Sequence, residues 1–175
     1  MLRGANDRNG HAGRETIAQR NGQLVRNFQG YSTHADCDLV ALGVSAIGHV
    51  MPTYSQNVRT LTEYYERLDQ GVLPVFRGIE LRFEDLWRRA IIQSLMCHCV
   101  LPIQSIESVF LIDFARHFER ELDALHGMED DELITCSKDW IEVTPKGRFL
   151  VRDICMVFDQ YLQRERELRR HSKAI

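Results

Sequence analysis

The stretch FEDLWRRAIIQSLMCHC, residues 83–99, decides the fold of the second half of the chain. Its apolar residues recur at every fourth position, from Phe83 through Ile91 to Cys99, while Arg89 and Gln93 fall on the other side. This spacing places side chains on one face of an α-helix. We therefore predict an amphipathic helix over 83–99 that buries one face in a helical core.

The residues that follow predict further helices and a hairpin. A helical turn over 105–108 leads into a helix over 110–126, which Gly127 ends. Its predicted buried stripe consists of Phe110, Phe114, Phe118, Leu122 and Leu125. Residues 133–137 and 140–143 predict a hairpin, and Thr144-Pro145 begins a long final helix that carries Leu150 and Tyr161 inward. We predict a mainly helical (α+β) fold class whose C-terminal domain is winged-helix-like.

The first half of the chain predicts less regular structure. Residues 1–23 form a flexible arm with a helical stub over 14–21, and the short glycine-punctuated runs over 24–50 indicate strand ends and loops. A helix capped by Asn57 runs to Asp69, and an extended connector follows over 75–81. We divide the chain into three parts: residues 1–23, 24–81 and 82–175.

Composition places the protein among ordinary globular domains. The chain has 175 residues, of which 44% are hydrophobic and 27% charged, with a formal net charge of −3. Five scattered cysteines fit a reducing compartment better than a secreted disulfide scaffold. No signal peptide or membrane-spanning run is present in the sequence. We predict a cytoplasmic protein with no membrane partner.

A winged helix often binds nucleic acid, but the local charge argues against it here. Residues 107–142 contain eleven acidic and three basic side chains. Such a surface repels phosphate, whose neutralisation supplies most nucleic-acid affinity. We predict no nucleic-acid partner.

Two groups of residues resemble metal ligands. Cys97 and Cys99 lie two positions apart on the predicted helix and therefore point in opposite directions, so we expect Cys99 to pack in the core and Cys97 to be partly exposed. His34, Asp36, Cys37 and Asp38 fall within five residues of a loop, where a cation remains a minor alternative. We predict no metal ligand and, from spacing alone, no catalytic residue.

Several motifs, in order, resemble a known family. They are Asn27-Phe28-Gln29-Gly30-Tyr31-Ser32-Thr33, Asp36-Cys37-Asp38-Leu39, Gly43-Val44-Ser45-Ala46-Ile47, Tyr54-Ser55-Gln56-Asn57, Phe76-Arg77-Gly78-Ile79, Arg88-Arg89 with Ser94-Leu95, Val143-Thr144-Pro145-Lys146-Gly147-Arg148 and Arg152-Asp153-Ile154-Cys155-Met156. From about Ala18 onward the chain resembles the C-terminal portion of the oxygen-independent coproporphyrinogen III oxidases, which are radical S-adenosylmethionine enzymes.

The resemblance implies a function in haem biosynthesis. Members decarboxylate two propionates of coproporphyrinogen III oxidatively, which gives protoporphyrinogen IX. It implies S-adenosylmethionine and a [4Fe-4S] cluster as cofactors of the full-length family. It also implies that Phe28, Gln29 and Ile47 contact S-adenosylmethionine; the alternative is that Phe28 and Ile47 are core residues. Residues 24–81 would then be a strand-and-loop remnant of the edge of a radical enzyme barrel.

The family's C-x3-C-x2-C cluster motif is absent from this sequence. We therefore expect a C-terminal fragment that retains neither cofactor and is inactive alone. The remainder of the barrel, in cis or in trans, is the expected partner, and the porphyrinogen substrate would bind the complete enzyme. Exposed strand edges also predict self-association. The alternative is a stand-alone helical docking module of winged-helix type without enzymatic activity.

Overall fold

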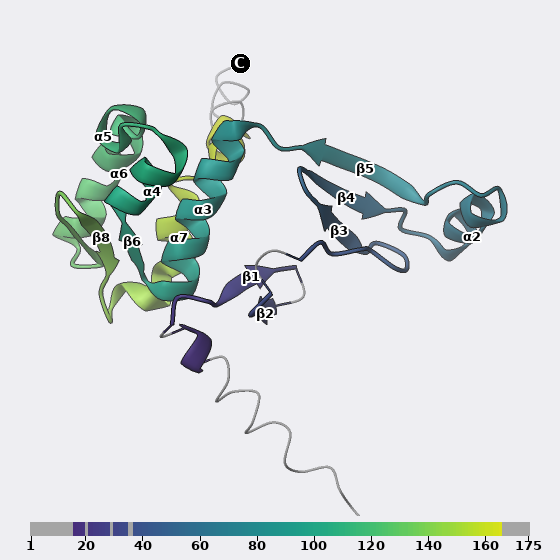
Figure 1. Ribbon diagram of the computed structural model, residues 1–175, viewed down its shortest axis with the longest axis horizontal. Coiled ribbons are helices and arrows are strands. Elements are labelled where there is room, and N and C mark those ends of the chain that lie inside the picture. The colour runs from purple at the N-terminus through teal and green to yellow at the C-terminus, as the bar shows by residue number, and fades with distance from the viewer. Residues whose placement is uncertain (1–15, 20, 29, 35–36, 166–175) are drawn as a thin grey trace, which may run out of the picture.

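The computed structural model describes residues 16–165 except residues 20, 29, 35 and 36. Figure 1 shows a helical domain that carries α3 on one side, and an arm of strands that extends away from it. A small hairpin, β1–β2, lies near one end of α3 (Figure 1). No described helix has the length and apolar character that crossing a membrane requires.

The arm is built from antiparallel strands, whereas the short glycine-punctuated runs over 24–50 predicted only strand ends and loops. β1 (Val25–Asn27) pairs with β2 (Gly30–Ser32). β3 (Ile47–Val50), β4 (Thr53–Asn57) and β5 (Val75–Glu80) form a second sheet in the order β3-β4-β5. The predicted connector over 75–81 is therefore extended, but most of it is a strand of this sheet.

The helix at the far end of the arm, α2 (Leu61–Asp69), begins later than predicted. Its cap is Thr60, whose side chain accepts a hydrogen bond from the backbone N–H of Glu63. Asn57 is buried at the end of β4, and its Nδ2 donates to the carbonyl oxygens of Ala41 and Gly43. The prediction of Asn57 as the cap is wrong because its side chain ties down a loop instead. None of the residues in α2 is buried.

The decisive helix, α3 (Phe83–His98), has almost the predicted bounds. Its first turn is closed by the Asp85 carboxylate, which accepts a hydrogen bond from the Arg82 N–H at 2.8 Å. Cys99 ends the helix in a left-handed conformation. The predicted burial of the two cysteines is reversed: Cys97 is fully buried and Cys99 only partly. Ala18, from the predicted helical stub, and Leu24 pack against Cys97.

The helical turn predicted over 105–108 is present as a longer helix, and the helix predicted over 110–126 is divided into two. They are α4 (Ile103–Phe110), α5 (Phe114–His117) and α6 (Glu119–Asp130). Leu111 ends α4 in a left-handed conformation, and the Asp113 side chain caps α5 by accepting from the Arg116 N–H. Gly127 lies inside α6, so the prediction that it ends the helix is wrong.

Besides its helices, the helical domain contains a three-stranded sheet. The predicted hairpin is present as β7 (Ile134–Cys136) and β8 (Trp140–Val143), and β6 (Val100–Pro102), which we did not predict, adds a strand in the order β6-β8-β7. The predicted long final helix is wrong. It consists of the 3-10 turn η1 (Gly147–Leu150), then α7 (Val151–Met156), and a separate helical segment over 160–165.

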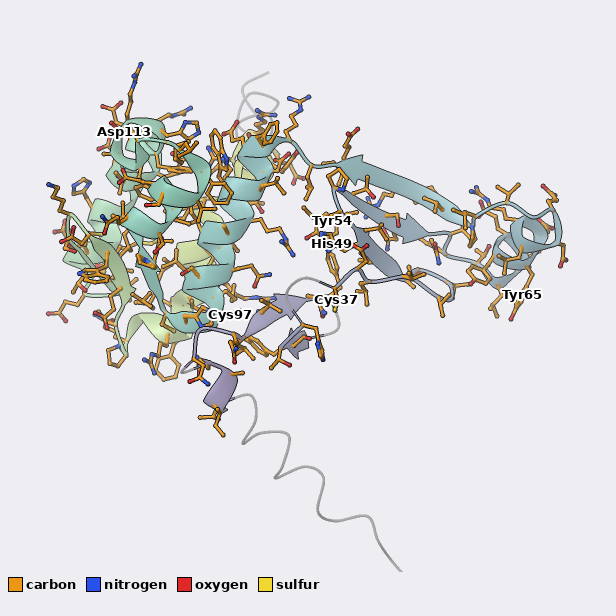
Figure 2. All side chains as sticks on the ribbon, in the orientation of Figure 1. Cys37, His49, Tyr54, Tyr65, Cys97 and Asp113 are labelled. Atoms are coloured by element: carbon orange, nitrogen blue, oxygen red, sulfur yellow. The ribbon has the colours of Figure 1, made fainter. Side chains whose placement is uncertain are left out.

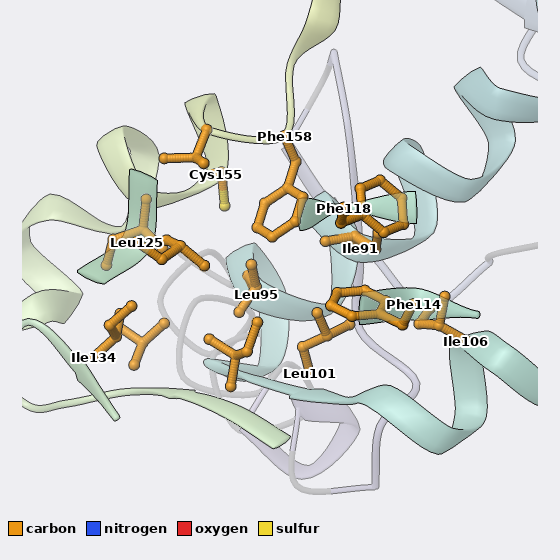
Figure 3. Close-up of a cluster of buried hydrophobic side chains, with 14 residues drawn as sticks. Ile91, Leu95, Leu101, Ile106, Phe114, Phe118, Leu125, Ile134, Cys155 and Phe158 are labelled. Carbon is orange, nitrogen blue, oxygen red and sulfur yellow. The ribbon is translucent and has the colours of Figure 1, made fainter. Parts of the chain in front are cut away.

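The core lies between these helices and the sheet (Figure 3). Three members of the predicted stripe, Phe114, Phe118 and Leu125, are buried, and the Phe118 ring meets Phe158 edge-on at 5.8 Å between centroids. Ile91 and Leu95 bring the apolar face of α3 to the same cluster. Leu150 and Tyr161, by contrast, were predicted to point inward and are 44% and 46% exposed. Leu150 ends the 3-10 turn η1 before α7 begins, and Tyr161 follows the break after α7, so neither lies on one continuous apolar helix face.

Candidate functional site

A cleft of about 810 Å³ lies between the helical domain and the arm. One wall is the polar side of α3 together with residues that follow α7, and the opposite wall comes from β1, β3, β4 and β5. The volume falls within the range of small-molecule sites, about 300–1,000 Å³. The site is therefore built from segments far apart in the sequence.

Tyr54 lies at the centre of the arm's wall. Its hydroxyl accepts a hydrogen bond from Nε of Arg89 on α3 at 2.9 Å. The His49 ring stacks on the Tyr54 ring with centroids 4.4 Å apart, and the Phe28 ring meets it edge-on at 5.7 Å. Figure 2 shows Tyr54 and His49 on the strands that face α3. These aromatic contacts hold the Tyr54 ring in one orientation.

The strand register and the helix period explain this arrangement. His49 and Tyr54 are opposite each other in the β3–β4 pair, so their side chains share one face of the sheet. Arg89 projects from the side of α3 that does not enter the core, as the sequence pattern predicts. Tyr54 of β4 and Arg89 of α3 thus meet across the cleft, and His49 of β3 supports the tyrosine from the same face of the sheet.

A second bridge joins α3 to β1. The Gln93 side chain accepts a hydrogen bond from the Arg26 N–H at 2.9 Å and donates one to the Arg26 carbonyl oxygen. Gln19 adds a third link, because its Nε2 donates to the carbonyl oxygen of Cys97 at 2.8 Å. These bonds fix the strands against the helix, and they therefore define the width of the cleft.

Most charged groups in the cleft wall already have partners. Arg88 is neutralised by Glu84 at 2.9 Å and by Glu121 at 2.6 Å. The buried Asp85 carboxylate accepts from Arg82 and from Gln160. Within the described residues, no carboxylate pairs with Arg89.

The surroundings of His49 favour its neutral form. Burial lowers its pKa below the ordinary value of 6.5, the positive charge of Arg89 lowers it further, and Asp38 opposes both effects. Its Nε2 lies 3.1 Å from the sulfur of Met51. His49 therefore favours its neutral form, and it does not place a second positive charge beside Arg89.

Of the three predicted cofactor-binding residues, the structure describes Phe28 and Ile47, and it places them differently. Phe28 lines the cleft and is 61% exposed, so it is not a core residue. Ile47 lies two residues before His49 on β3, hence on the same face, but it does not line the cleft. Gln29 lies outside the described residues. Contact of these residues with S-adenosylmethionine stays a prediction.

No pattern in the sequence indicated a role for Tyr54 or Arg89. Both occur in motifs that carry the family resemblance, which was the available signal. Their hydrogen bond joins residues 35 positions apart, a distance over which no helix or strand period applies.

Three of the five cysteines, Cys97, Cys136 and Cys155, are poor ligands for an iron-sulfur cluster. Burial raises the pKa of Cys97 and of Cys136 to about 11, and that of Cys155 to about 12, which disfavours the thiolate that iron requires. No three His, Cys, Asp or Glu side chains of the described residues lie together as a metal site would require. Of the loop candidates, His34 and Cys37 line the cleft, whereas Asp36 is outside the described residues.

Comparison with known proteins gives consistent matches. A family model described as the HemN C-terminal domain matches residues 81–150. Oxygen-independent coproporphyrinogen III oxidase of Synechocystis sp. is 43% identical over 163 residues, which cover 91% of this chain and 35% of that protein. The protein of the same name from Pseudomonas aeruginosa is 47% identical over 145 residues, 83% of this chain and 32% of that protein.

A solved structure matches as well. It is coproporphyrinogen III oxidase (HemN) from Escherichia coli, described as a radical SAM enzyme. The TM-score is 0.81 at 42% identity, over 84% of this chain and 34% of that chain. The chain thus spans about a third of the length of the relatives it matches.

Proposed function

Because the chain is a relative of the C-terminal portion of oxygen-independent coproporphyrinogen III oxidases, we propose that it serves as that portion of such an enzyme. The reaction would be the oxidative decarboxylation of two propionates of coproporphyrinogen III in haem biosynthesis. The observation that carries the proposal is a match over nine tenths of the chain that includes both walls of the cleft.

In this function the chain holds one side of the substrate. The bridges from Arg89 to Tyr54 and from Gln93 to β1 keep the helical domain against the arm, so that the cleft has a fixed width. The enclosing walls would exclude water from the part of the ligand they cover. The helical domain is thus a wall and support for the binding site.

The radical chemistry belongs to the part of the relatives that this chain does not match. When bound, a [4Fe-4S] cluster and S-adenosylmethionine supply the radical that starts the reaction. Cys97, Cys136 and Cys155 are poor ligands for that cluster, and we propose that the chain alone is not catalytic. Phe28, Gln29 and Ile47 would contribute contacts to S-adenosylmethionine, a role that the position of Phe28 in the cleft supports.

The proposal includes the architecture of residues 82–175. We propose a winged-helix-like domain: the order α3, β6, α4, α5, α6, β7, β8 supports this, and the turn over 137–139 that joins β7 to β8 would be the wing. With residues 24–81 as the edge of a barrel, the boundary between the two parts falls at Leu81 and Arg82. The acidic surface of residues 107–142 favours a structural role for this domain over nucleic-acid binding.

A chimaera tests the function. Residues 18–175 would replace the corresponding C-terminal third of the Pseudomonas aeruginosa relative, and anaerobic conversion of coproporphyrinogen III would be followed by porphyrin fluorescence after chromatography. We expect conversion by the chimaera and by the intact relative, and none by the relative's first two thirds alone. The isolated chain, treated with iron and sulfide under anaerobic conditions, should not cleave S-adenosylmethionine.

Two results would contradict the proposal. A correctly folded chimaera with a bound cluster but no conversion would favour a docking module without enzymatic function. Cleavage of S-adenosylmethionine by the isolated chain would show that it holds a cluster in a way its described cysteines do not suggest.

A further inference from the structure

Arg89 differs from Arg88 in that no carboxylate of the described residues pairs with it, and from the exposed Arg152 of the same cleft in that a hydrogen bond orients it. Its Nε donates to the Tyr54 hydroxyl, while its two Nη groups have no acceptor in the part of the chain that the structure describes. The side chain lines the cleft and is only half-buried. A guanidinium that is partly removed from water and has no anionic partner in the protein is suited to bind the anionic group of a ligand.

The neighbouring arginines show the contrast. Arg88 binds two carboxylates and the carbonyl oxygen of Phe158. Arg26 donates to the Met96 sulfur and lies over the Tyr31 ring at 5.5 Å. Both are occupied in holding the fold together. Arg89 is therefore the cleft arginine that combines a fixed orientation with free donors.

Tyr54 sets that orientation. With Nε committed to the tyrosine oxygen, the edge formed by Nη1 and Nη2 is left for the ligand. That edge presents two parallel N–H groups, the geometry that matches the two oxygens of a carboxylate. The Tyr54 ring is itself held by His49 and Phe28, so the guanidinium loses little freedom when a ligand binds.

We propose that Arg89, positioned by Tyr54, binds a propionate carboxylate of the tetrapyrrole in this cleft. This inference rests on the proposed function and deepens it by naming the group recognised and the residue that recognises it. S-adenosylmethionine also carries a carboxylate. The aromatic rings around Tyr54, the cleft volume of about 810 Å³ and the four carboxylates of coproporphyrin favour the tetrapyrrole over S-adenosylmethionine as the ligand of Arg89.

A binding titration with the 175-residue chain tests the inference. Coproporphyrin III, which fluoresces, would be titrated with wild type, with Arg89→Met, with Tyr54→Phe and with Arg148→Met. Arg148 is an exposed arginine of η1 outside the cleft, and its substitution makes the same change in net charge. Tyr54→Phe keeps the ring contacts and removes only the hydroxyl.

We expect Arg89→Met to raise the Kd for coproporphyrin III about tenfold or more, as the loss of a charged hydrogen bond predicts. Arg89→Lys should recover part of that loss, Tyr54→Phe should raise the Kd about threefold, and Arg148→Met should leave it unchanged. The tetramethyl ester of coproporphyrin III, which has no carboxylate, should bind wild type and Arg89→Met equally. A merely structural role of Arg89 would weaken both ligands.

The outcomes separate this inference from the proposed function. Tight binding of coproporphyrin III by Arg89→Met would overturn the inference and leave the function standing. Arg89-dependent binding of S-adenosylmethionine, without binding of coproporphyrin III, would overturn the tetrapyrrole as the ligand of Arg89 and leave the proposed function standing, because failure of that function is read from the chimaera. Circular dichroism would check each variant's fold; if Arg89→Met unfolds, Arg89→Lys and Tyr54→Phe decide.

Discussion

Replacing Gly147 with alanine should destabilise the helical domain strongly. Gly147 is buried at the start of η1, and a Cβ atom there would lie 1.9 Å from the carbonyl oxygen of Leu133 and 3.1 Å from Cγ1 of Val143. The Leu133 oxygen cannot retreat freely, because it accepts hydrogen bonds from the backbone N–H of Thr144 at 3.0 Å and from its hydroxyl at 3.1 Å.

The expected cost follows from these contacts. Overpacking in a core costs about 1–3 kcal/mol, and each hydrogen bond broken to relieve the clash adds about 1 kcal/mol. The sum is about 3–5 kcal/mol in the free energy of unfolding. For a chain of this length, each kcal/mol of lost stability lowers the melting temperature by about 2–4 °C, so the melting temperature of Gly147→Ala should fall by about 10 °C.

Gly127→Ala is the matched control. Gly127 lies inside α6, where an added Cβ would have no atom within 4 Å, so the substitution should stabilise the helix by about 0.5–1 kcal/mol. Thermal melts of both variants, followed by circular dichroism at 222 nm, about the wavelength of the helix signal, measure the difference. A Gly147→Ala protein that melts at or above the wild-type temperature would refute the reasoning from the Leu133 contact.

Three further predictions concern the core, the cleft histidine and the thiols. Phe158→Ala should lower the free energy of unfolding by about 3–5 kcal/mol, whereas Leu111→Ala, at a side chain that is 90% exposed, should change it by less than about 0.5 kcal/mol; urea denaturation compares them. The lowered pKa of His49 means that the unfolded state binds its proton first, so stability should fall as the pH drops below about 6.5, and urea midpoints of His49→Gln should depend less on pH over that window. A thiol reagent should modify the exposed Cys37 quickly and the buried Cys155, whose pKa is raised to about 12, only after denaturant is added; rapid modification of Cys155 in the native protein would contradict its burial.

The sequence predicted elements whose signal is local. The helix predicted over 83–99 is present over Phe83–His98 because one apolar period repeats along it, but the ends of its predicted stripe were misassigned: Phe83 is 80% exposed, and the burial of the two cysteines is reversed. Cys97 is covered by Ala18, about eighty positions earlier, which no periodicity could indicate. The final helix was predicted as continuous because its apolar spacing continues past α7, yet the Asp159 carboxylate accepts a hydrogen bond from the Leu162 N–H and begins a new segment.

The site was predictable only through resemblance. Phe28 was found because a motif carries it, and it lines the cleft. Arg89 was correctly predicted to face away from the core, but its partner Tyr54 belongs to a strand pair whose register depends on the turn between β3 and β4. A cleft formed by three distant segments leaves no single stretch of sequence that records it.

The helix α3 belongs to two environments at once. Ile91 and Leu95 anchor it in the apolar core, while Arg89 and Gln93, on its other side, reach the arm. Any molecule that occupies the cleft must therefore raise the melting temperature of the whole helical domain through mass action. Conversely, a defect deep in the core would weaken ligand affinity without touching the ligand, so thermal shift and affinity should rise and fall together across a panel of variants.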